Sequence, residues 1–282
     1  MRGTRARKAV SNAVVALCGG AVLLALVPLF FVFAYVISKG FSSLNWDFFT
    51  SAPKPVGEPG GGMANAMIGT LILIGIASAV AVPVGVIAGV YLSEYGKKKF
   101  ATLVRFTADV LNGVPSIVIG IFAYGLAVLP VKHFSALAGG LALGFMMIPI
   151  ITRTTEELLN LVPGSLREGA LALGATRARA AFSVMVPAAL PGIMTGILVA
   201  LARIAGETAP LLFTAFNNRF FTTRLDQPIS SLPVQIYTYA VAPYEDWHRQ
   251  AWAGALVLVA FVFTFSVLAR VVTRRLERMH RT

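Results

Sequence analysis

Residues 198–213 read LVALARIAGETAPLLF, an apolar run that is interrupted by Arg203 and Glu207. Side chains four residues apart lie on one face of a continuous helix. At 1.5 Å per residue from Gly192, Arg203 lies roughly 16 Å into a bilayer, near its midplane. A charge there costs roughly 2.5–3.5 kcal/mol on insertion scales and is tolerated where it faces protein or a water-filled path. The stretch therefore predicts a membrane helix whose charged face is turned away from lipid.

The rest of the chain has the composition of an integral membrane protein. Of its 282 residues, 57% are hydrophobic and only 13% are charged, and the mean hydropathy is +0.77. Soluble domains are closer to half apolar and a quarter charged. The net charge of +12 comes from basic residues beside apolar runs, as the positive-inside rule describes, so we expect no nucleic-acid partner. The three histidines and the single cysteine have no metal-site spacing, and we expect no metal.

Six apolar runs are long enough to cross a membrane, which takes roughly 20 residues. They cover residues 13–38, 67–91, 104–129, 137–159, 188–212 and 251–273. The first run is about twice the length of a signal-peptide core and has no clear cleavage site, so we interpret it as a retained span. The boundaries of the third and fourth runs are the least sharply defined, because polar residues enter them. The sequence thus predicts an all-α membrane protein with about six transmembrane helices.

The Lys and Arg residues set the expected orientation. With the N-terminus inside, 17 of the 24 Lys and Arg residues fall in cytoplasmic segments and six in external ones, which leaves Arg203 in the membrane. This asymmetry predicts cytoplasmic N- and C-termini, and therefore an even number of spans. An aromatic belt is then expected near the outer surface, formed by Trp46, Tyr237, Tyr239, Tyr244, Trp247 and Trp252.

The cytoplasmic segment between the fourth and fifth runs predicts a short helix. It reads LVPGSLREGALALGATRARAAFSVMVPAALPG over residues 161–192. Pro163 ends the preceding helix, and Ser165 with Glu168 three residues later predicts a capping box. Gly174 is expected to end or bend the short helix. Such a helix between two spans offers a firm point against which another protein can push.

Two interpretations of Arg203 and Glu207 remain open from the residues alone. The two charges can form a neutralised ion pair that fixes helix packing. Alternatively, the guanidinium of Arg203 can donate to the oxygens of a passing oxyanion. A carboxylate repels sulfate, whereas it can accept a hydrogen bond from phosphate, which keeps one or two protons at neutral pH. The pair therefore suits phosphate better than sulfate.

The cytoplasmic segment resembles permease subunits of ATP-binding-cassette importers. These carry Glu-Ala-Ala, three residues, Gly, nine residues and then Ile-x-Leu-Pro. This chain matches that spacing with Glu168, Gly169, Ala170, Gly174, Val184, Val186 and Pro187. It differs at three of these positions, where Gly169, Val184 and Val186 replace Ala, Ile and Leu. The resemblance implies a MetI-like permease fold, in which this helix couples the spans to an ATPase subunit. The simpler possibility, that Glu168 only caps its own helix, is compatible with that role.

The motif ARIAGETAPLLFTAF at residues 202–216 is similar to the fifth-span signature of PstA-type permeases of the phosphate importer. The likeness extends to GGGMANAMIGT and IPIITRTTEE, so it covers most of residues 60–216. It implies that Arg203 and Arg153 take part in translocation, with Glu207 as the acidic partner. Arg153 also fits a positive-inside anchor.

The resemblance also implies the partners and the domain limits. The partners are a second homologous permease (PstC type), two copies of an ATPase (PstB type) that bind ATP and Mg²⁺, an external phosphate-binding protein (PstS type) and membrane lipids. This chain itself needs no cofactor and is not an enzyme, because its spans hold no nucleophile–base constellation. A permease for another oxyanion or small solute is the alternative. We divide the chain into residues 1–66 (tail, first span and external loop), 67–275 (core of a cell inner-membrane permease, with the coupling loop at about 160–187) and 276–282 (cytoplasmic tail).

Overall fold

A computed structural model describes residues 2–56, 58, 60–96 and 99–279 of the chain. The side chains of residues 2–6, 9, 269 and 272–279 lie outside that description. Lys97, Lys98 and residues 280–282, which we assigned to cytoplasmic segments, also lie outside the described residues. Over the described part the chain folds into helices and contains no strand, so the predicted all-α class is confirmed.

Among the described residues, five continuous helical segments are long and apolar enough to cross a membrane. They are α1 (Arg2–Gly40), α3 (Ala64–Tyr95), α6 (Ala136–Leu161), the run of α8 (Arg177–Ala180), η3 (Ala181–Met185) and α9 (Val186–Ile204), and α12 (Glu245–Met279). The predicted C-terminal tail thus begins inside α12. Each of the five contains one of the predicted apolar runs, in whole or in large part.

The third predicted span, residues 104–129, is not one helix. It is divided into α4 (Lys99–Gly113) and the pair α5 (Ser116–Ala123) and η2 (Tyr124–Val128), with a bend of 109° between them. Pro115 explains the break, because proline drives the preceding residue, Val114, out of the helical conformation. The predicted run therefore comprises two helices joined at a sharp bend. The bent pair counts as a sixth crossing only if its two arms together traverse the bilayer.

The fifth span also differs from the prediction of residues 188–212. It begins at Arg177, eleven residues earlier, and ends at Ile204. Within it, η3 is a π-helical turn just before Pro187, a residue that has no N–H to donate and crowds the carbonyl four positions back. The π turn therefore carries the helix through a proline that would otherwise break it. Beyond Ile204 the chain turns and starts the short helix α10 (Ala209–Thr214).

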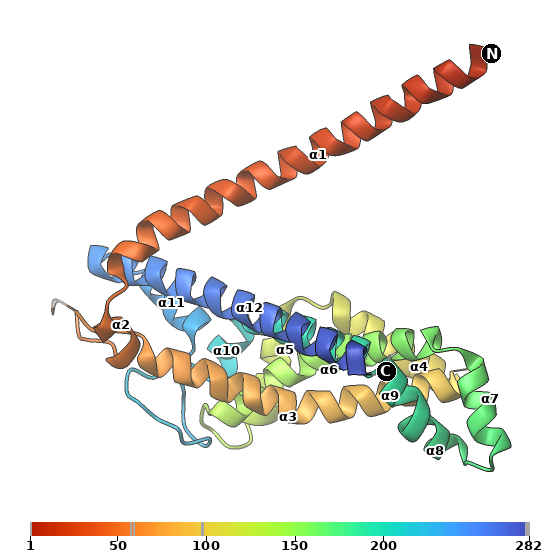
Figure 1. Cartoon of the computed structure of the whole chain (residues 1–282). Helices are drawn as coiled ribbons and strands as arrows, with labels where there is room; N and C mark the ends of the chain where they lie inside the picture. Colours follow the sequence, from red (N-terminus) through yellow and green to blue (C-terminus); the bar gives the residue numbers. More distant parts are fainter. Residues whose placement is uncertain (1, 57, 59, 97–98, 280–282) are drawn as a thin grey trace.

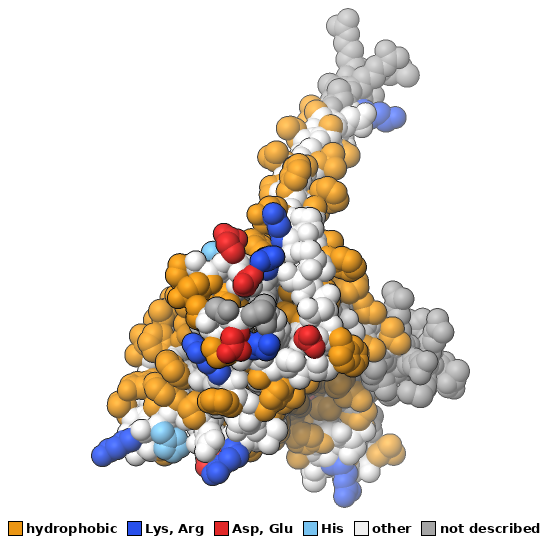
Figure 2. Space-filling view, turned by 90° about the vertical axis from the view of Figure 1, so that its left-hand side faces the viewer, with side chains coloured by type: hydrophobic (Ala, Val, Ile, Leu, Met, Phe, Trp, Pro, Cys, Tyr) orange, Lys and Arg blue, Asp and Glu red, His pale blue; other side chains and the backbone are white. Residues whose placement is uncertain are grey.

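Several of the shorter elements lie at the two ends of the bundle (Figure 1). One end holds η1 (Phe41–Ser43), α2 (Trp46–Thr50) and α11 (Leu232–Ala240), and the other holds α7 (Gly164–Ala172) and α8. Viewed from the α2–α11 end, charged side chains lie across the middle of the face and along its lower edge, with hydrophobic ones between and around them (Figure 2). Such a charged end face is expected of the part of a membrane protein that reaches water.

The core is centred on α3 and α6, which pack closely along their length. A Cβ at Gly85 would collide with Ile151, and one at Gly89 would collide with Thr155, so both glycines let the two backbones approach. Leu143 and Met147 of α6 are fully buried in the same cluster. By contrast, none of the apolar window of α1 is buried within this chain, and α1 leans away from the bundle in Figure 1.

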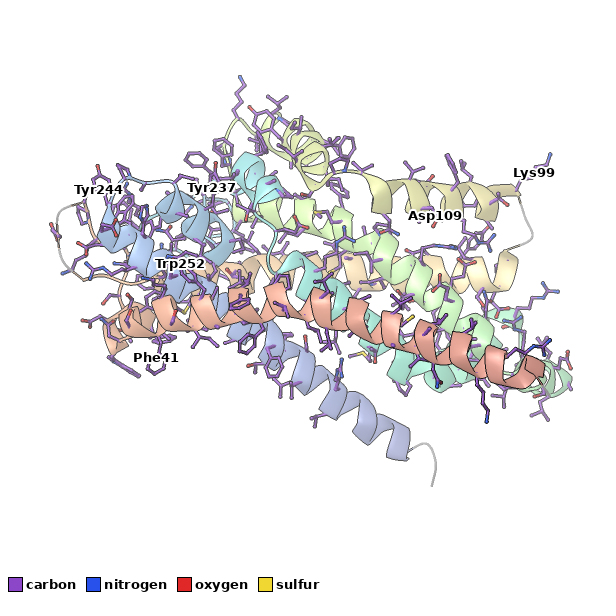
Figure 3. The ribbon with its side chains drawn as sticks, turned by 90° about the horizontal axis from the view of Figure 1, so that it is seen from above. Phe41, Lys99, Asp109, Tyr237, Tyr244 and Trp252 are labelled. Carbon is purple, nitrogen blue, oxygen red and sulfur yellow. The ribbon has the colours of Figure 1, made fainter. Side chains whose placement is uncertain are left out.

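Most of the predicted aromatic belt lies at the α2–α11 end. Tyr237, Tyr244 and Trp252 lie at that end in Figure 3, opposite Lys99. Tyr239 is an exception, because it is buried and stacks on Trp247 with ring centroids 4.5 Å apart. Burial accordingly raises the pKa of the Tyr239 hydroxyl. This tyrosine belongs to the core rather than to a lipid-facing belt.

Candidate functional site

Arg203 and Glu207 do not share a face of one helix. Arg203 lies in the last turn of α9, which ends at Ile204, and Glu207 lies in the turn that follows. Pro210 explains the early end, because a helix continued through it would crowd the carbonyl of Gly206 and lack a donor. The predicted i, i+4 geometry is therefore wrong, and the two charges flank a break in the fifth span.

Arg203 is exposed on the surface of this chain. With Thr195 and Val199, which lie eight and four residues before it, it forms an exposed strip along α9, while the opposite face of the helix is buried in the core. No ion pair or side-chain hydrogen bond of Arg203 occurs among the described residues. Its position in the last turn is favourable, because the carbonyl end of a helix attracts a cation. The guanidinium donors themselves remain available.

The break after α9 leaves open space around its backbone. Nothing lies within 4 Å of a Cβ built at Gly206, and the N–H of Glu207 donates to the carbonyl of Ile204 at 3.2 Å. The Glu207 side chain makes no ion pair within the described part of the chain and is partly exposed. Interrupted membrane helices of this kind are tolerated where the backbone borders protein or a water-filled cavity.

The two broken spans meet each other. After the break, α10 packs against α5 at the point where Pro210 lies against Gly120, so closely that a Cβ at Gly120 would collide with it. The 109° bend of the third span and the interruption of the fifth are thus brought together through these two short helices. This places irregular backbone from two spans beside one another, next to the end of α9 that carries Arg203.

Arg153 lies in a different environment, inside a network of four charged side chains. Its Nε is 2.9 Å from Asp109 Oδ1 on α4, and its Nη1 donates to Glu156 Oε2 at 2.6 Å. Arg105 on α4 completes the network, since its Nε donates to Glu156 Oε1 at 2.7 Å. The Glu156 side chain is only 4% exposed, whereas that of Asp109 is 55% exposed. The network ties α4 to α6 around one buried carboxylate.

The packing of α6 on α9 fixes the relative heights of the two arginines. A Cβ at Gly192 would collide with Leu158, and one at Gly196 with Thr154, so the two helices run antiparallel. Continued along α9, this pairing puts Arg203 about six residues, or about 9 Å, from Arg153 along the helix axis. The structure therefore brings the two arginines to neighbouring levels of the membrane but not into contact through any described ion pair.

Sequence reasoning missed two of these partners. The sequence analysis assigned no role to Asp109 or to Glu156. The spacing of Arg153 and Glu156, three residues apart on a predicted helix, was the signal that could have paired them. The pairing of Arg153 with Asp109 joins distant parts of the chain and left no local signal.

The short helix predicted between the fourth and fifth runs is present as α7. The predicted capping box is wrong: Pro163 occupies the N-cap position and no side chain caps the helix, so Ser165 and Glu168 lie inside it. At its other end Gly174 has φ +83°, its N–H donates to the carbonyl of Leu171, and the N–H of Ala175 donates to that of Ala170. This pair of hydrogen bonds is a Schellman motif, so the prediction that Gly174 ends the helix is confirmed.

The motif residues of α7 point outward. None of its residues is buried, and Glu168 and Gly169 are exposed, whereas Ala170 is partly covered. Glu168 makes no ion pair within the part of the chain that the structure describes. Among the described residues no group of three His, Cys, Asp or Glu side chains is arranged to hold a metal ion. These motif residues are thus open to contact with another protein.

Comparison with known proteins places the chain in a family. Residues 81–278 match the model of the binding-protein-dependent transport system inner membrane component. The phosphate transport system permease protein PstA of Haemophilus influenzae is 45% identical over 251 residues, which are 88% of each chain. PstA of Xylella fastidiosa is 47% identical over 242 residues, 85% of this chain and 84% of its own. A probable PstA of Methanocaldococcus jannaschii is 36% identical, again over 88% of each chain.

Solved structures share the fold at low sequence identity. The methionine transporter MetNI in an inward-facing conformation aligns with a TM-score of 0.60 at 20% identity, over 76% of this chain and 94% of its own. A bacterial alginate ABC transporter aligns with a TM-score of 0.64 at 15% identity, over 90% and 93%. Both are ABC transporters, which fits the MetI-like fold. The chain therefore belongs to the family of binding-protein-dependent transport system inner membrane components, and within it to the permeases of the PstA type.

Proposed function

We propose that this chain is the permease subunit of an ATP-driven importer of inorganic phosphate and forms half of its translocation pathway. The observation that carries the proposal is Arg203, a guanidinium without a partner among the described residues, on an exposed face of a membrane span and beside an interrupted backbone. The names of the relatives identify the transported ion as phosphate. The permease itself is not an enzyme, because ATP is hydrolysed in another subunit.

The exposed strip of α9 supports a pathway rather than a lipid-facing role. An unpaired arginine within a membrane span is costly against lipid, so the strip requires either water or protein opposite it. A second permease that presents a similar span would complete the walls of such a path. Phosphate would then exchange its water shell for the fork of guanidinium donors, which match its oxygens in geometry.

Glu207 supports phosphate over sulfate in this setting. It lies just past the helix break, on the far side of Gly206 from Arg203, and is partly exposed. A carboxylate at that place repels a fully deprotonated sulfate, but it can accept a hydrogen bond from the remaining proton of phosphate. Arg203 attracts both anions, so the discrimination between them rests on Glu207. The role of Arg153, which is already paired with two carboxylates, is to set the position of α4 on α6 near the path.

The partners follow from the likeness to PstA-type permeases. The 282 residues contain no P-loop motif, and the likeness implies that ATP and Mg²⁺ are bound by an ATPase of the PstB type, in two copies. The α7 motif, including Glu168, Gly169, Ala170 and Gly174, docks one of these copies. A second permease of the PstC type covers the exposed strip and contacts α1, and a PstS-type protein delivers phosphate to the α2–α11 end.

We infer that both termini and α7 face the cytoplasm, in the inner membrane. The excess of Lys and Arg on that side supports this orientation. It requires six crossings, so the bent pair of α4 and α5 must pass through the bilayer as one broken span. Broken spans are common in transporters at the level where the substrate binds.

A permease for another oxyanion or small solute is the second candidate, and the names of the relatives disfavour it. The two are separated by uptake into ATP-loaded vesicles that contain the complete complex. We expect labelled phosphate to accumulate only with ATP inside and an intact ATPase subunit. Excess arsenate, which also keeps a proton, should compete, whereas excess sulfate should not. ATP-driven uptake of sulfate in place of phosphate would contradict the proposal.

A further inference from the structure

The coupling helix α7 has few contacts with the rest of the chain apart from its own connections. None of its residues is buried, and it packs mainly on the following elements α8 and η3. Behind it lies a cavity of about 600 Å³, lined on one side by the end of α3 and on the other by α7 and α8. Packed side chains therefore do not hold α7 against the span bundle on that side.

One ion pair crosses this cavity. Arg167 of α7 approaches Glu94 of α3 with 2.9 Å between Nη2 and Oε1. The Glu94 side chain is only 8% exposed and that of Arg167 is 33% exposed, so the pair is partly withdrawn from water. Among the described residues no other ion pair involves α7. Glu94 is also in the last turn of α3, where the helix dipole disfavours an anion, and Arg167 offsets that cost.

The end of α3 that carries Glu94 is firmly joined to its neighbours. Arg105 of α4 donates to the carbonyl of Gly96 at 3.1 Å, and the hydroxyl of Ser93 donates to Asn160 of α6 at 3.0 Å. Together with the glycine-mediated packing of α3 on α6, these contacts join the two spans closely. A force on Glu94 would therefore act on both α3 and α6 rather than on the end of α3 alone.

The two ends of α7, in contrast, join the rest of the chain through non-helical residues. It follows α6 through Val162 and Pro163, both in extended conformation, and it leaves through Gly174 in the left-handed region. Without a contact between α7 and the spans, a force on α7 would change the backbone conformation at its two ends rather than move the spans. We propose that the Arg167–Glu94 ion pair locks the coupling helix to the α3–α6 pair, so that movement of the ATPase is transmitted to the spans. Both are positioning residues, and this inference rests on the proposed function.

The test measures phosphate uptake and ATP hydrolysis in the same vesicles, with the complete complex and its external binding protein. The variants are Glu94→Gln, Arg167→Gln, the double variant, and Arg167→Lys, which keeps the charge. Arg177→Gln is the matched control, because Arg177 lines the same cavity from α8 and makes no described ion pair. The readout is phosphate moved per ATP hydrolysed, which a general loss of folded protein leaves unchanged.

We expect each Gln variant to lower that ratio about tenfold, and the double variant to lose no more than either single one. Arg167→Lys and the Arg177→Gln control should stay within about twofold of the wild type. A wild-type ratio in the single Gln variants would overturn the proposal, as would losses that multiply in the double variant. If a Gln variant does not assemble, Glu94→Asp and Arg167→Lys decide, because a tenfold loss with both charges kept would also overturn it.

Failure of the proposed substrate has a different signature. A wild-type complex that moves no phosphate would disprove the proposed function. The role of the Arg167–Glu94 ion pair would then be tested by a second readout. That readout is the stimulation of ATP hydrolysis by the binding protein, which requires no knowledge of the transported ion. We expect about a tenfold loss of this stimulation in Glu94→Gln and Arg167→Gln, and none in Arg177→Gln. Unchanged stimulation in both Gln variants would overturn that role.

Discussion

Two arginines occupy the membrane part of this protein at neighbouring levels, yet their surroundings are opposite. Arg153 on α6 contacts two carboxylates, one of them almost fully buried. Arg203 on α9 is exposed, at the end of its helix, and pairs with no described side chain. The comparison teaches that the charge of an intramembrane residue does not reveal its role. The role is indicated by the side chains with which the residue pairs, because a paired arginine holds helices together and an unpaired one remains free to bind an anion.

The largest effect on stability should come from the carboxylate at the centre of the Arg153 network. Glu156→Gln leaves Arg105 and Arg153 without their shared partner. Removing one member of a buried pair costs roughly 3–5 kcal/mol, and we expect about 3 kcal/mol here because both arginines are partly solvated. The measurement is the thermal unfolding midpoint of the purified complex in detergent. A midpoint equal to that of the wild type would show that the network does not stabilise the fold.

A smaller loss is expected from Arg153→Gln, with Arg203→Gln as its matched control. Arg153→Gln leaves Glu156 with Arg105 alone, so we expect a cost of about 1–2 kcal/mol. Arg203→Gln removes the same charge at a similar depth but breaks no described contact, and its midpoint should not fall. Equal destabilisation by the two variants would contradict the distinction between a paired Arg153 and an unpaired Arg203.

Asp109→Asn should have a still smaller effect. Asp109 contacts Arg153 from α4, but its side chain is 55% exposed, and pairs open to water contribute roughly 0–1 kcal/mol. The double variant Asp109→Asn with Arg153→Gln should then be no less stable than Arg153→Gln alone. A further loss in the double variant, seen in the same unfolding assay, would mean that Asp109 stabilises the protein by another route.

The smallest effect is expected outside the membrane, at the exposed Arg224–Asp226 pair. The hydrogen bond from Arg224 holds the pKa of Asp226 below its ordinary value. A lowered carboxylate pKa contributes stability above the ordinary pKa, and the contribution is lost as the pH falls through the lowered value. Water screens this pair fully, so Asp226→Asn should leave the unfolding midpoint unchanged from neutral to acidic pH. A pH-dependent difference from the wild type would contradict that expectation.

The sequence predicted the helical class and the existence of five spans, because the length of an apolar run is set by the bilayer, although the bounds of the fifth span were shifted. The breaks in the third and fifth spans were harder to predict from the sequence. Pro115 was visible, but membrane helices can bend at a proline without breaking, as the run through Pro187 shows. Pro210 was visible too, yet its effect begins four residues earlier, at Gly206, and this removed Arg203 and Glu207 from a shared helix face.

The contacts between charged residues were mostly beyond sequence reasoning. Arg153 with Asp109, and Arg167 with Glu94, join segments that are far apart in the chain, and only the packing of α3, α4 and α6 brings them together. Glu94 gave one weak signal, an acidic residue at the carbonyl end of a helix, where a cation is expected nearby. The coupling motif was recognised from spacing, but the absence of a capping box was not, because Pro163 competes for the N-cap position.

The central claim is that Arg203 is free to bind the transported anion, and phosphate uptake tests it most directly. The complete complex is reconstituted with wild type, Arg203→Gln, Glu207→Gln and the double variant, and assembly and ATP hydrolysis are verified in each. Losing a charge-assisted hydrogen bond of about 1.5–3 kcal/mol predicts a roughly 10- to 150-fold fall in uptake for Arg203→Gln. The double variant should remain as slow. Recovery of transport in the double variant would contradict the claim and show that the two charges only balance each other.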